Sequence, residues 1–189
     1  MRTSIAIVGG GPAGCAAALT LRRYLPNVSA TLVTRPVSSM VDAPAVGETL
    51  SPGVLPLLNY LGLREEFLHL GHLPSGGTAS AWGSGHLFER NYLFTGQGHG
   101  WHLDRSRFDA WLLSNAEDAD IPCIRSHALR ATRSEGFWRI ELEGGRELVA
   151  QCDRRGDRPL DMAFTPSGRF AAEGRWTGGR RPMVPARTS

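Results

Sequence analysis

A glycine-rich loop near the start of the chain has the residue types and spacing of a phosphate-binding site. Its pattern, G-x-G-x-x-G, is made by Gly9, Gly10, Gly11, Pro12, Ala13 and Gly14. The first glycine of such a loop allows a tight turn, the second lets the backbone approach a pyrophosphate, and the third lets the following helix pack on its strand. The N-terminus of that helix presents free N–H groups to an anion. We therefore predict that this loop binds the pyrophosphate of a dinucleotide.

The residues at the end of the next apolar run bear on which dinucleotide is bound. A fold of this kind usually carries an acidic residue there, ~20 residues after the glycines, to hold the ribose hydroxyls. Here Thr34 and Arg35 take that place. A threonine hydroxyl makes a weaker ribose contact, Arg35 could attract the 2′-phosphate of NADP, and both residues could simply end a strand. An NADP-binding reductase module therefore stays open as an alternative.

The elements that must position these residues form a βαβ unit. Thr3–Val8 and Ala30–Thr34 are short apolar runs with β-branched residues, typical of buried parallel strands. Between them, Pro12–Tyr24 has small residues in its first turns and leucines further on, which predicts a helix. Such crossovers are right-handed. Ile121–Ile124 is the expected third parallel strand.

The remaining patterns predict two short helices, a small antiparallel sheet and a meander. Residues 35–46 are expected to form a loop, followed by helices at Pro52–Tyr60 and Arg64–Leu70. Short strands are expected at Thr78–Trp82, His86–Glu89 and Asn91–Thr95. After the glycine-rich residues 96–100, a helix capped by Asp104 or Ser106 is expected to run to about Asp118. The meander is expected at Ala128–Ser134, Phe137–Leu142 and Glu147–Ala150.

Composition argues against several other classes of function. The 189 residues carry a net charge of +3, but eight of the 21 basic residues follow Gln151 and none is lysine, so the basic excess is local and does not indicate nucleic-acid binding. No apolar run approaches the ~20 residues that span a membrane. Three scattered cysteines favour a reducing cytoplasm over a disulfide framework. His99 and His102 lack matching carboxylates, so no metal site is predicted.

Two further segments, taken together with the glycine loop, resemble one flavoprotein superfamily. The segment Gly47-Glu48-Thr49-Leu50-Ser51-Pro52 resembles the G-E-(S/T)-L-x-P segment of flavin-dependent halogenases and their monooxygenase relatives. The stretch W-H-L-D-R-S-R-F-D at residues 101–109, with Ser80–Ser84 before it, is similar to a subgroup of that superfamily. The subgroup includes FAD-dependent maturases that oxidise side chains of partner enzymes carrying peptide-derived quinone cofactors. The resemblance covers roughly residues 3–150.

This resemblance implies FAD as the cofactor and a set of residues that bind it. The pyrophosphate would lie on Gly9–Gly14, the loop of Gly47, Glu48 and Thr49 would approach the isoalloxazine, and Arg105 would help to hold the cofactor. Reduced flavin would react with oxygen to give a peroxyflavin that hydroxylates a small aromatic or peptide-borne substrate. A flavin reductase or NAD(P)H would supply the electrons. No catalytic side chain is assigned.

Two departures from the family pattern shape the expected function. Related halogenases use an active-site lysine and, in the tryptophan halogenases, a W-x-W-x-I-P signature; this chain has neither, which favours a monooxygenase. In the family, the chain returns to the dinucleotide-binding sheet after the meander through a turn with a D-A-T-G-R-like sequence. In this chain only Asp153 and Gly156 match that turn. We therefore expect residues 151–189 to be a basic, disordered tail, and our hypothesis for its origin is a frameshift near Cys152. A truncated, non-catalytic fragment is a second alternative.

Taken as a whole, the sequence predicts an α/β fold. We expect an incomplete FAD/NAD(P)-binding, Rossmann-like domain of the two-dinucleotide-fold flavoprotein type over residues 1–150. Inserted antiparallel strands on the substrate side are expected at about residues 75–105. The leading function is that of a FAD-dependent monooxygenase.

Overall fold

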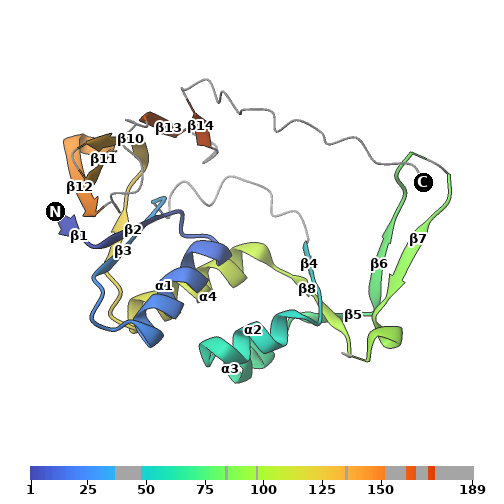
Figure 1. Cartoon of the computed structure of the whole chain (residues 1–189). Coiled ribbons are helices and arrows are strands. Elements are labelled where there is room, and N and C mark those ends of the chain that lie inside the picture. The colour runs from blue at the N-terminus through green and yellow to red at the C-terminus, as the bar shows by residue number, and fades with distance from the viewer. Residues whose placement is uncertain are drawn as a thin grey trace, which may run out of the picture.

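The computed structural model describes residues 1–36, 48–83, 85–96, 98–134, 136–151, 161–164 and 170–172. Its helices are α1 (Pro12–Tyr24), α2 (Val54–Leu61), α3 (Arg64–His69) and α4 (Arg105–Asp118). Its strands are β1 (Arg2–Thr3), β2 (Ile5–Val8), β3 (Ala30–Thr34), β4 (Glu48–Leu50), β5 (Leu73–Ser75), β6 (Gly77–Ser80), β7 (Phe88–Asn91), β8 (Gly100–Leu103), β9 (Cys123–Arg125), β10 (Ala128–Ser134), β11 (Phe137–Leu142), β12 (Arg146–Gln151), β13 (Asp161–Phe164) and β14 (Phe170–Ala172). Figure 1 shows their arrangement.

A parallel sheet in the order β2-β3-β9 forms the centre of the fold. Both pairs of neighbours are parallel, and α1 connects β2 to β3, so the predicted βαβ unit is confirmed. The third strand is also confirmed, but it begins at Cys123 because the N–H of Ile121 bonds to the carbonyl oxygen of Ala116 at the end of α4. The first predicted strand is broken at Ser4, where β1 leaves to join a different sheet.

Helices cover one face of the parallel sheet and an antiparallel sheet covers the other. This division follows from strand geometry, because successive side chains of a strand point to opposite faces. Leu32 and Cys123 pack with residues of α1 and α4 in one apolar cluster. Their neighbours Val33 and Ile124 pack against residues of β10, β11 and β12 in a second cluster. The fold therefore has three layers with two separate cores.

Helices α1 and α4 lie side by side and run in the same direction (Figure 1). α1 leaves the carboxyl end of β2, while α4 leads into β9, a strand parallel to β2, so both helices begin at the carboxyl ends of the strands. At their other ends, Arg22 Nε donates to the carbonyl oxygen of Ala119 at 2.9 Å. Asp104 caps α4 by accepting from the N–H of Arg107 at 3.0 Å, which selects one of the two predicted caps.

The meander of β10, β11 and β12 agrees closely with its predicted ranges. At the turn between β11 and β12, Gly144 and Gly145 have φ values of 77° and 74°, which glycine adopts without strain. β1 adds to β12 in parallel, and β13 and β14 extend the sheet beyond β10. These last two strands lie where the sequence predicted a disordered tail. The composition of β13 and β14 does not predict strands, because pairing at the edge of a sheet depends on the neighbouring strand more than on the local sequence pattern.

A second group of elements packs against α4. Strands β4, β8 and β5 form an antiparallel sheet in that order, and α2 and α3 share its core. Phe67 of α3 is fully buried, with its ring edge-on to Trp101 at a centroid distance of 5.2 Å and to Phe108 at 6.0 Å. Because Phe108 belongs to α4, this aromatic cluster joins the second group to the βαβ unit.

Two of the three antiparallel strands predicted between β5 and α4 are present, as β6 and β7, and the third is not a strand. Gly100–Leu103 is a strand rather than part of a glycine-rich loop, and Tyr92–Thr95 is a 3₁₀ turn rather than a strand. Tyr92 is only 5% exposed, and its N–H donates to the carbonyl oxygen of Gly76 at 2.9 Å. Burying this ring turns the chain inward and ends β7. The hairpin of β6 and β7 projects away from the rest of the fold (Figure 1).

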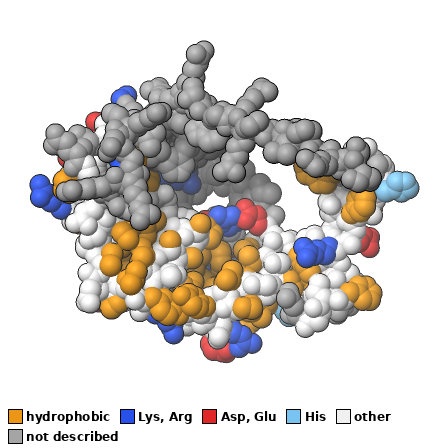
Figure 2. All heavy atoms as spheres, in the orientation of Figure 1, with side chains coloured by type: hydrophobic (Ala, Val, Ile, Leu, Met, Phe, Trp, Pro, Cys, Tyr) orange, Lys and Arg blue, Asp and Glu red, His pale blue; other side chains and the backbone are white. Residues whose placement is uncertain are grey.

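Exposed apolar side chains include some on the β6–β7 hairpin and some on the helical side of the fold. Trp82 and Phe88 are largely exposed on the hairpin. On the helical side, Tyr24 and Tyr60 stack with ring centroids 4.7 Å apart and are each about half exposed. Figure 2 shows hydrophobic side chains gathered on this face. Among the described helices, none has the length and apolar character needed to cross a membrane.

His72 lies against the aromatic cluster. Its ring is 5.5 Å from that of Phe67 and 6.2 Å from that of Phe108, centroid to centroid. Its Nε2 is buried without a hydrogen-bond partner among the described residues. Burial lowers the pKa of His72 below its ordinary value of 6.5, and the charge of Arg107 lowers it further, while Asp104 opposes the shift. The neutral ring is therefore favoured in the folded state.

We expect the free energy of unfolding to fall as the pH drops below about 6.5. His72 of the unfolded chain takes up a proton near that pH, whereas His72 of the folded chain does so only at a lower pH. The stability that the neutral ring contributes is therefore complete above pH 6.5, and it is lost as the pH falls toward the lower pKa of the folded state. Urea unfolding between roughly pH 5 and 8 measures this dependence. His72→Phe should flatten it, and His69→Gln, at an exposed position on α3, should not. An equal pH dependence in all three chains would contradict the assignment to His72.

Candidate dinucleotide-binding site

The glycine loop lies between the carboxyl end of β2 and the first turn of α1. Gly9 has a φ of +121°, which residues with a side chain rarely adopt, and its N–H donates to the carbonyl oxygen of Val33 at 2.8 Å. A Cβ added at Gly14 would overlap the carbonyl oxygen of Gly9. The helix therefore rests directly on the turn, which accounts for the first and third glycines of the pattern.

The residues at the end of β3 have different surroundings. A Cβ added at Gly10 would overlap the side chain of Thr34, which is 3% exposed. The Thr34 side chain therefore lies under the loop and sets its shape. Arg35, the next residue, is exposed. Of the two residues considered for the ribose end of a dinucleotide, Arg35 is the one whose side chain a ligand can reach.

Gly11 leaves the space in front of α1 open. It is the N-cap of the helix, with extended backbone at φ −78° and ψ −176°, and no described atom lies within 4 Å of a Cβ built on it. No side chain caps the helix, and Pro12 at its first position has no N–H to satisfy. The next two N–H groups, those of Ala13 and Gly14, precede the first intrahelical hydrogen bond, which Cys15 donates to Gly11, and with the helix dipole behind them they suit an anion. The loop fits the pyrophosphate of a dinucleotide.

Three charged side chains meet at the start of α4. Arg105 Nε donates to Asp109 Oδ1 at 2.7 Å, one helical turn along, and Arg105 Nη1 donates to Glu48 Oε2 on β4. The side chains of Asp109, Arg105 and Glu48 are 15%, 33% and 51% exposed. The hydrogen bond that Arg105 donates to Asp109, and then the one that it donates to Glu48, raise the pKa of Arg105 against the effect of burial, so the guanidinium stays charged. We call this group the Arg105 cluster.

The pairing of β4 with β8 brings Glu48 to Arg105. Glu48 lies opposite Leu103, two residues before Arg105, although 57 residues separate Glu48 from Arg105 in the chain. Thr49 lies opposite His102 and is exposed. Gly47, the third residue expected in the flavin loop, lies outside the described residues. The structure thus unites two of the predicted cofactor residues, Glu48 and Arg105, in direct contact.

Cys15 lies beneath the glycine loop and is not a nucleophile. It is fully buried, and its Sγ lies 3.3 Å from the carbonyl oxygen of Gly10. Burial raises the pKa of its thiol to about 11, with smaller contributions from Cys123 and from the carboxylate of Asp109. A thiol with this pKa is protonated at neutral pH.

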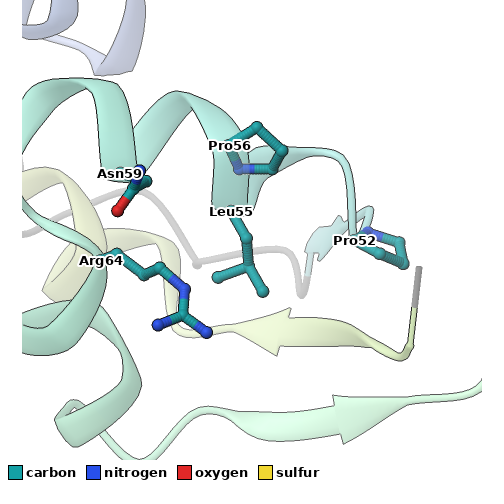
Figure 3. A pocket seen from close by; sticks show the side chains of 5 residues that line it. All are labelled: Pro52, Leu55, Pro56, Asn59 and Arg64. Carbon is teal, nitrogen blue, oxygen red and sulfur yellow. The ribbon is translucent and has the colours of Figure 1, made fainter.

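One cavity in the described part of the chain lies away from the glycine loop and has little charged chemistry. It has a volume of about 550 Å³, is shown in Figure 3 and is lined by Pro52, Leu55, Pro56, Asn59 and Arg64. Its one charged group, the guanidinium of Arg64, is paired with the carboxylate of Glu65 at 2.5 Å. The described residues hold no cluster of three or more metal-ligating side chains. The glycine loop with the Arg105 cluster is therefore the candidate site.

Comparisons with known proteins agree on one group of relatives. Residues 4–74 match the tryptophan halogenase family. The FAD-dependent oxidoreductase LodB of Marinomonas mediterranea is 32% identical over 152 residues, which cover 78% of this chain and 40% of LodB. The flavin-dependent halogenase CmlS has a TM-score of 0.64 at 25% identity, covering 80% of this chain and 28% of CmlS. The chain is therefore similar to flavin-dependent halogenases and to a FAD-dependent oxidoreductase.

This relationship supports the expected fold and FAD as the cofactor. The fold is shared with the peptidyl tryptophan dihydroxylase QhpG as well, with a TM-score of 0.54 at 22% identity over 90% of this chain and 44% of QhpG. The family match and CmlS favour halogenases among the relatives, whereas the absence of lysine had favoured a monooxygenase. The chain spans less than half the length of each of these relatives.

Sequence reasoning missed Asp109 as a member of the site. Its side chain is only 15% exposed, and it accepts a hydrogen bond from Nε of Arg105 at 2.7 Å. The signal was available: Arg105 and Asp109 are four residues apart on a predicted helix, a spacing at which side chains meet. What the spacing could not show is that this face of the helix lies near the glycine loop.

Proposed function

We propose that this chain is the FAD-binding part of an oxygen-dependent flavoenzyme, a monooxygenase in class, that acts on an aromatic substrate. The observation that supports this most is the meeting of two helix N-termini at one edge of the parallel sheet. α1 brings the glycine loop to this edge, and α4 brings the charged guanidinium of Arg105. Both ends carry partial positive charge, which suits the pyrophosphate of FAD.

In this proposal the residues of the chain bind and orient the cofactor, which supplies the redox chemistry when bound. The loop Gly9–Gly14 holds the pyrophosphate, and Arg105 contributes a charged donor. Arg35 stands at the ribose end, and Glu48 and Thr49 stand with Gly47 on the flavin side. Electrons come from a flavin reductase or NAD(P)H. The substrate is an aromatic compound, free or carried on a peptide.

We expect the purified chain to retain the visible absorption bands of flavin after it is mixed with FAD and desalted. The glycine loop and the Arg105 cluster both lie within the described residues, so the groups proposed to contact the pyrophosphate belong to this chain. NADP is the matched control ligand, because it shares the adenosine and pyrophosphate groups. Thermal stabilisation by NADP but not by FAD would select the reductase alternative, and a colourless protein would favour the non-catalytic fragment.

Halogenation is a second candidate, favoured by the family match over residues 4–74 and by CmlS. The two reactions differ in what is added to the substrate. The assay would supply the chain with reduced flavin, oxygen and either free tryptophan or a tryptophan-containing peptide, with and without bromide. Mass spectrometry would measure the masses of the products. Gain of an oxygen atom in both conditions supports the monooxygenase. A product that contains bromine supports the halogenase and contradicts our preference.

A further inference from the structure

The Arg105 cluster contains a carboxylate whose role has not been assigned, that of Asp109. We propose that Asp109 is a positioning residue that holds the guanidinium of Arg105 beside the glycine loop, so that the free N–H groups of Arg105 bind a phosphate of FAD. This inference rests on the proposed function, because it requires FAD to bind at the glycine loop.

The contact between Asp109 and Arg105 has the geometry of a fixed support. Asp109 accepts from Nε, the nitrogen nearest the side-chain stem, at 2.7 Å. Its neighbour Phe108 is 4% exposed in the main apolar core, which fixes the backbone that carries the carboxylate. A guanidinium has five N–H donors, and Asp109 and Glu48 engage Nε and Nη1. Nη2 has no recorded acceptor among the described residues and can serve a phosphate.

Asp109 and Glu48 hold Arg105 with different firmness. The side chain of Asp109 is 15% exposed and lies on the same helix as Arg105, whereas that of Glu48 is 51% exposed and lies on β4. Exposed ion pairs are screened by salt and contribute little, about 0–1 kcal/mol. Asp109 is therefore the carboxylate that stays bound to Arg105, and Glu48 is the carboxylate that an incoming phosphate can displace.

The cluster lies close enough to the glycine loop for this role. Cys15, in the first turn of α1, and Phe108, in the first turn of α4, belong to one apolar cluster. Helices α1 and α4, which carry these residues, pack against each other. Both helices begin at the same edge of the parallel sheet. Arg105 is therefore anchored at the edge where the pyrophosphate is proposed to bind.

A charge argument and a positioning argument predict opposite signs for removal of Asp109. A carboxylate near a phosphate repels it, so if Asp109 acted only through its charge, neutralising it would tighten FAD binding. If Asp109 positions Arg105, its removal lets the guanidinium leave the site, and FAD binding weakens. A purely structural role would change stability without this dependence on Arg105.

The test is a fluorescence titration of FAD with the wild-type chain, Asp109→Ala, Asp109→Asn, Arg105→Ala and the double variant. We expect Asp109→Ala to raise the Kd roughly 5- to 20-fold, as loss of one charge-assisted hydrogen bond would. Asp109→Asn keeps an oxygen acceptor and should lose less. The double variant should bind no more weakly than Arg105→Ala alone, because Asp109 acts through Arg105.

Glu117→Gln is the matched control. Glu117 lies on the same helix and accepts from Arg125 at 2.6 Å, but two turns further along α4; its loss should leave the Kd unchanged. Unchanged or tighter FAD binding in both Asp109 variants, or a double variant weaker than either single one, would overturn the inference. If Asp109→Ala does not fold by circular dichroism, Asp109→Asn decides the sign. Failure of the wild-type chain itself to bind FAD would instead refute the proposed function.

Discussion

Replacing Gly14 by alanine is expected to destabilise the chain by about 3 kcal/mol or more. The added Cβ would overlap the carbonyl oxygen of Gly9, which is backbone and cannot rotate away. Either α1 must separate from the turn or Gly9 must leave its conformation at φ +121°. Both changes disturb the core beneath, where Cys15 is fully buried. The midpoint of urea unfolding measures the loss.

Whether Gly14→Ala raises or lowers the free energy of unfolding shows which effect dominates at this position, the tertiary contact with Gly9 or helix propensity. Alanine favours a helix over glycine by about 1 kcal/mol, so propensity alone would make Gly14→Ala stabilising. Gly53→Ala is the matched control: Gly53 has φ −60° and precedes α2, and a Cβ there would meet only Ser51 Oγ at 3.6 Å. We expect it to change stability by less than about 0.5 kcal/mol. Equal effects at the two positions would show that the contact with Gly9 has been misassigned.

Replacing Gly11 by alanine is expected to leave the fold intact but to lower the affinity for FAD roughly 30- to 100-fold. Its φ of −78° suits alanine, and the added Cβ would meet no described atom within 4 Å. The Cβ would instead occupy the space in front of α1 where the pyrophosphate is proposed to approach the backbone. The weakening of two charge-assisted hydrogen bonds at this turn accounts for a loss of FAD affinity of this size.

Two measurements on the same sample check the Gly11→Ala prediction. The unfolding midpoint should stay close to that of the wild-type chain, and fluorescence titration should show the weaker FAD binding. Gly14→Ala gives the contrasting pattern, because it loses stability first and binding as a consequence. Unchanged FAD affinity in a folded Gly11→Ala chain would mean that the cofactor does not approach this turn.

Segments with strong local patterns were predicted well. α1 and β3 have the predicted bounds, because an apolar run followed by glycines and a small-residue helix leaves few alternatives. The meander was recognised from alternating residues between turns rich in glycine. The family resemblance is confirmed by the match to the tryptophan halogenase family. The roles of individual cofactor residues remain predictions.

Segments shaped by distant contacts were predicted less well. β8 was missed because its glycines suggested a loop, although Trp101 and Leu103 alternate with exposed His102. The 3₁₀ turn after β7 depends on a pocket for the ring of Tyr92, which lies against Gly100. β13 and β14 depend on the edge of β10. In each case the conformation of the segment depends on a residue that is remote in sequence, so no local pattern predicts it.

By itself the sequence determined the dinucleotide loop, because a turn followed closely by a helix requires glycine at set positions, whatever surrounds it. Only the tertiary structure decided which charged groups stand beside that loop. Pairing of β4 with β8 brings Glu48 to Arg105, and packing of α4 on α1 brings the helix that carries Arg105 and Asp109 beside the helix that follows the loop. Backbone conformation is a local property, whereas the field at a binding site is the sum over residues that folding brings together.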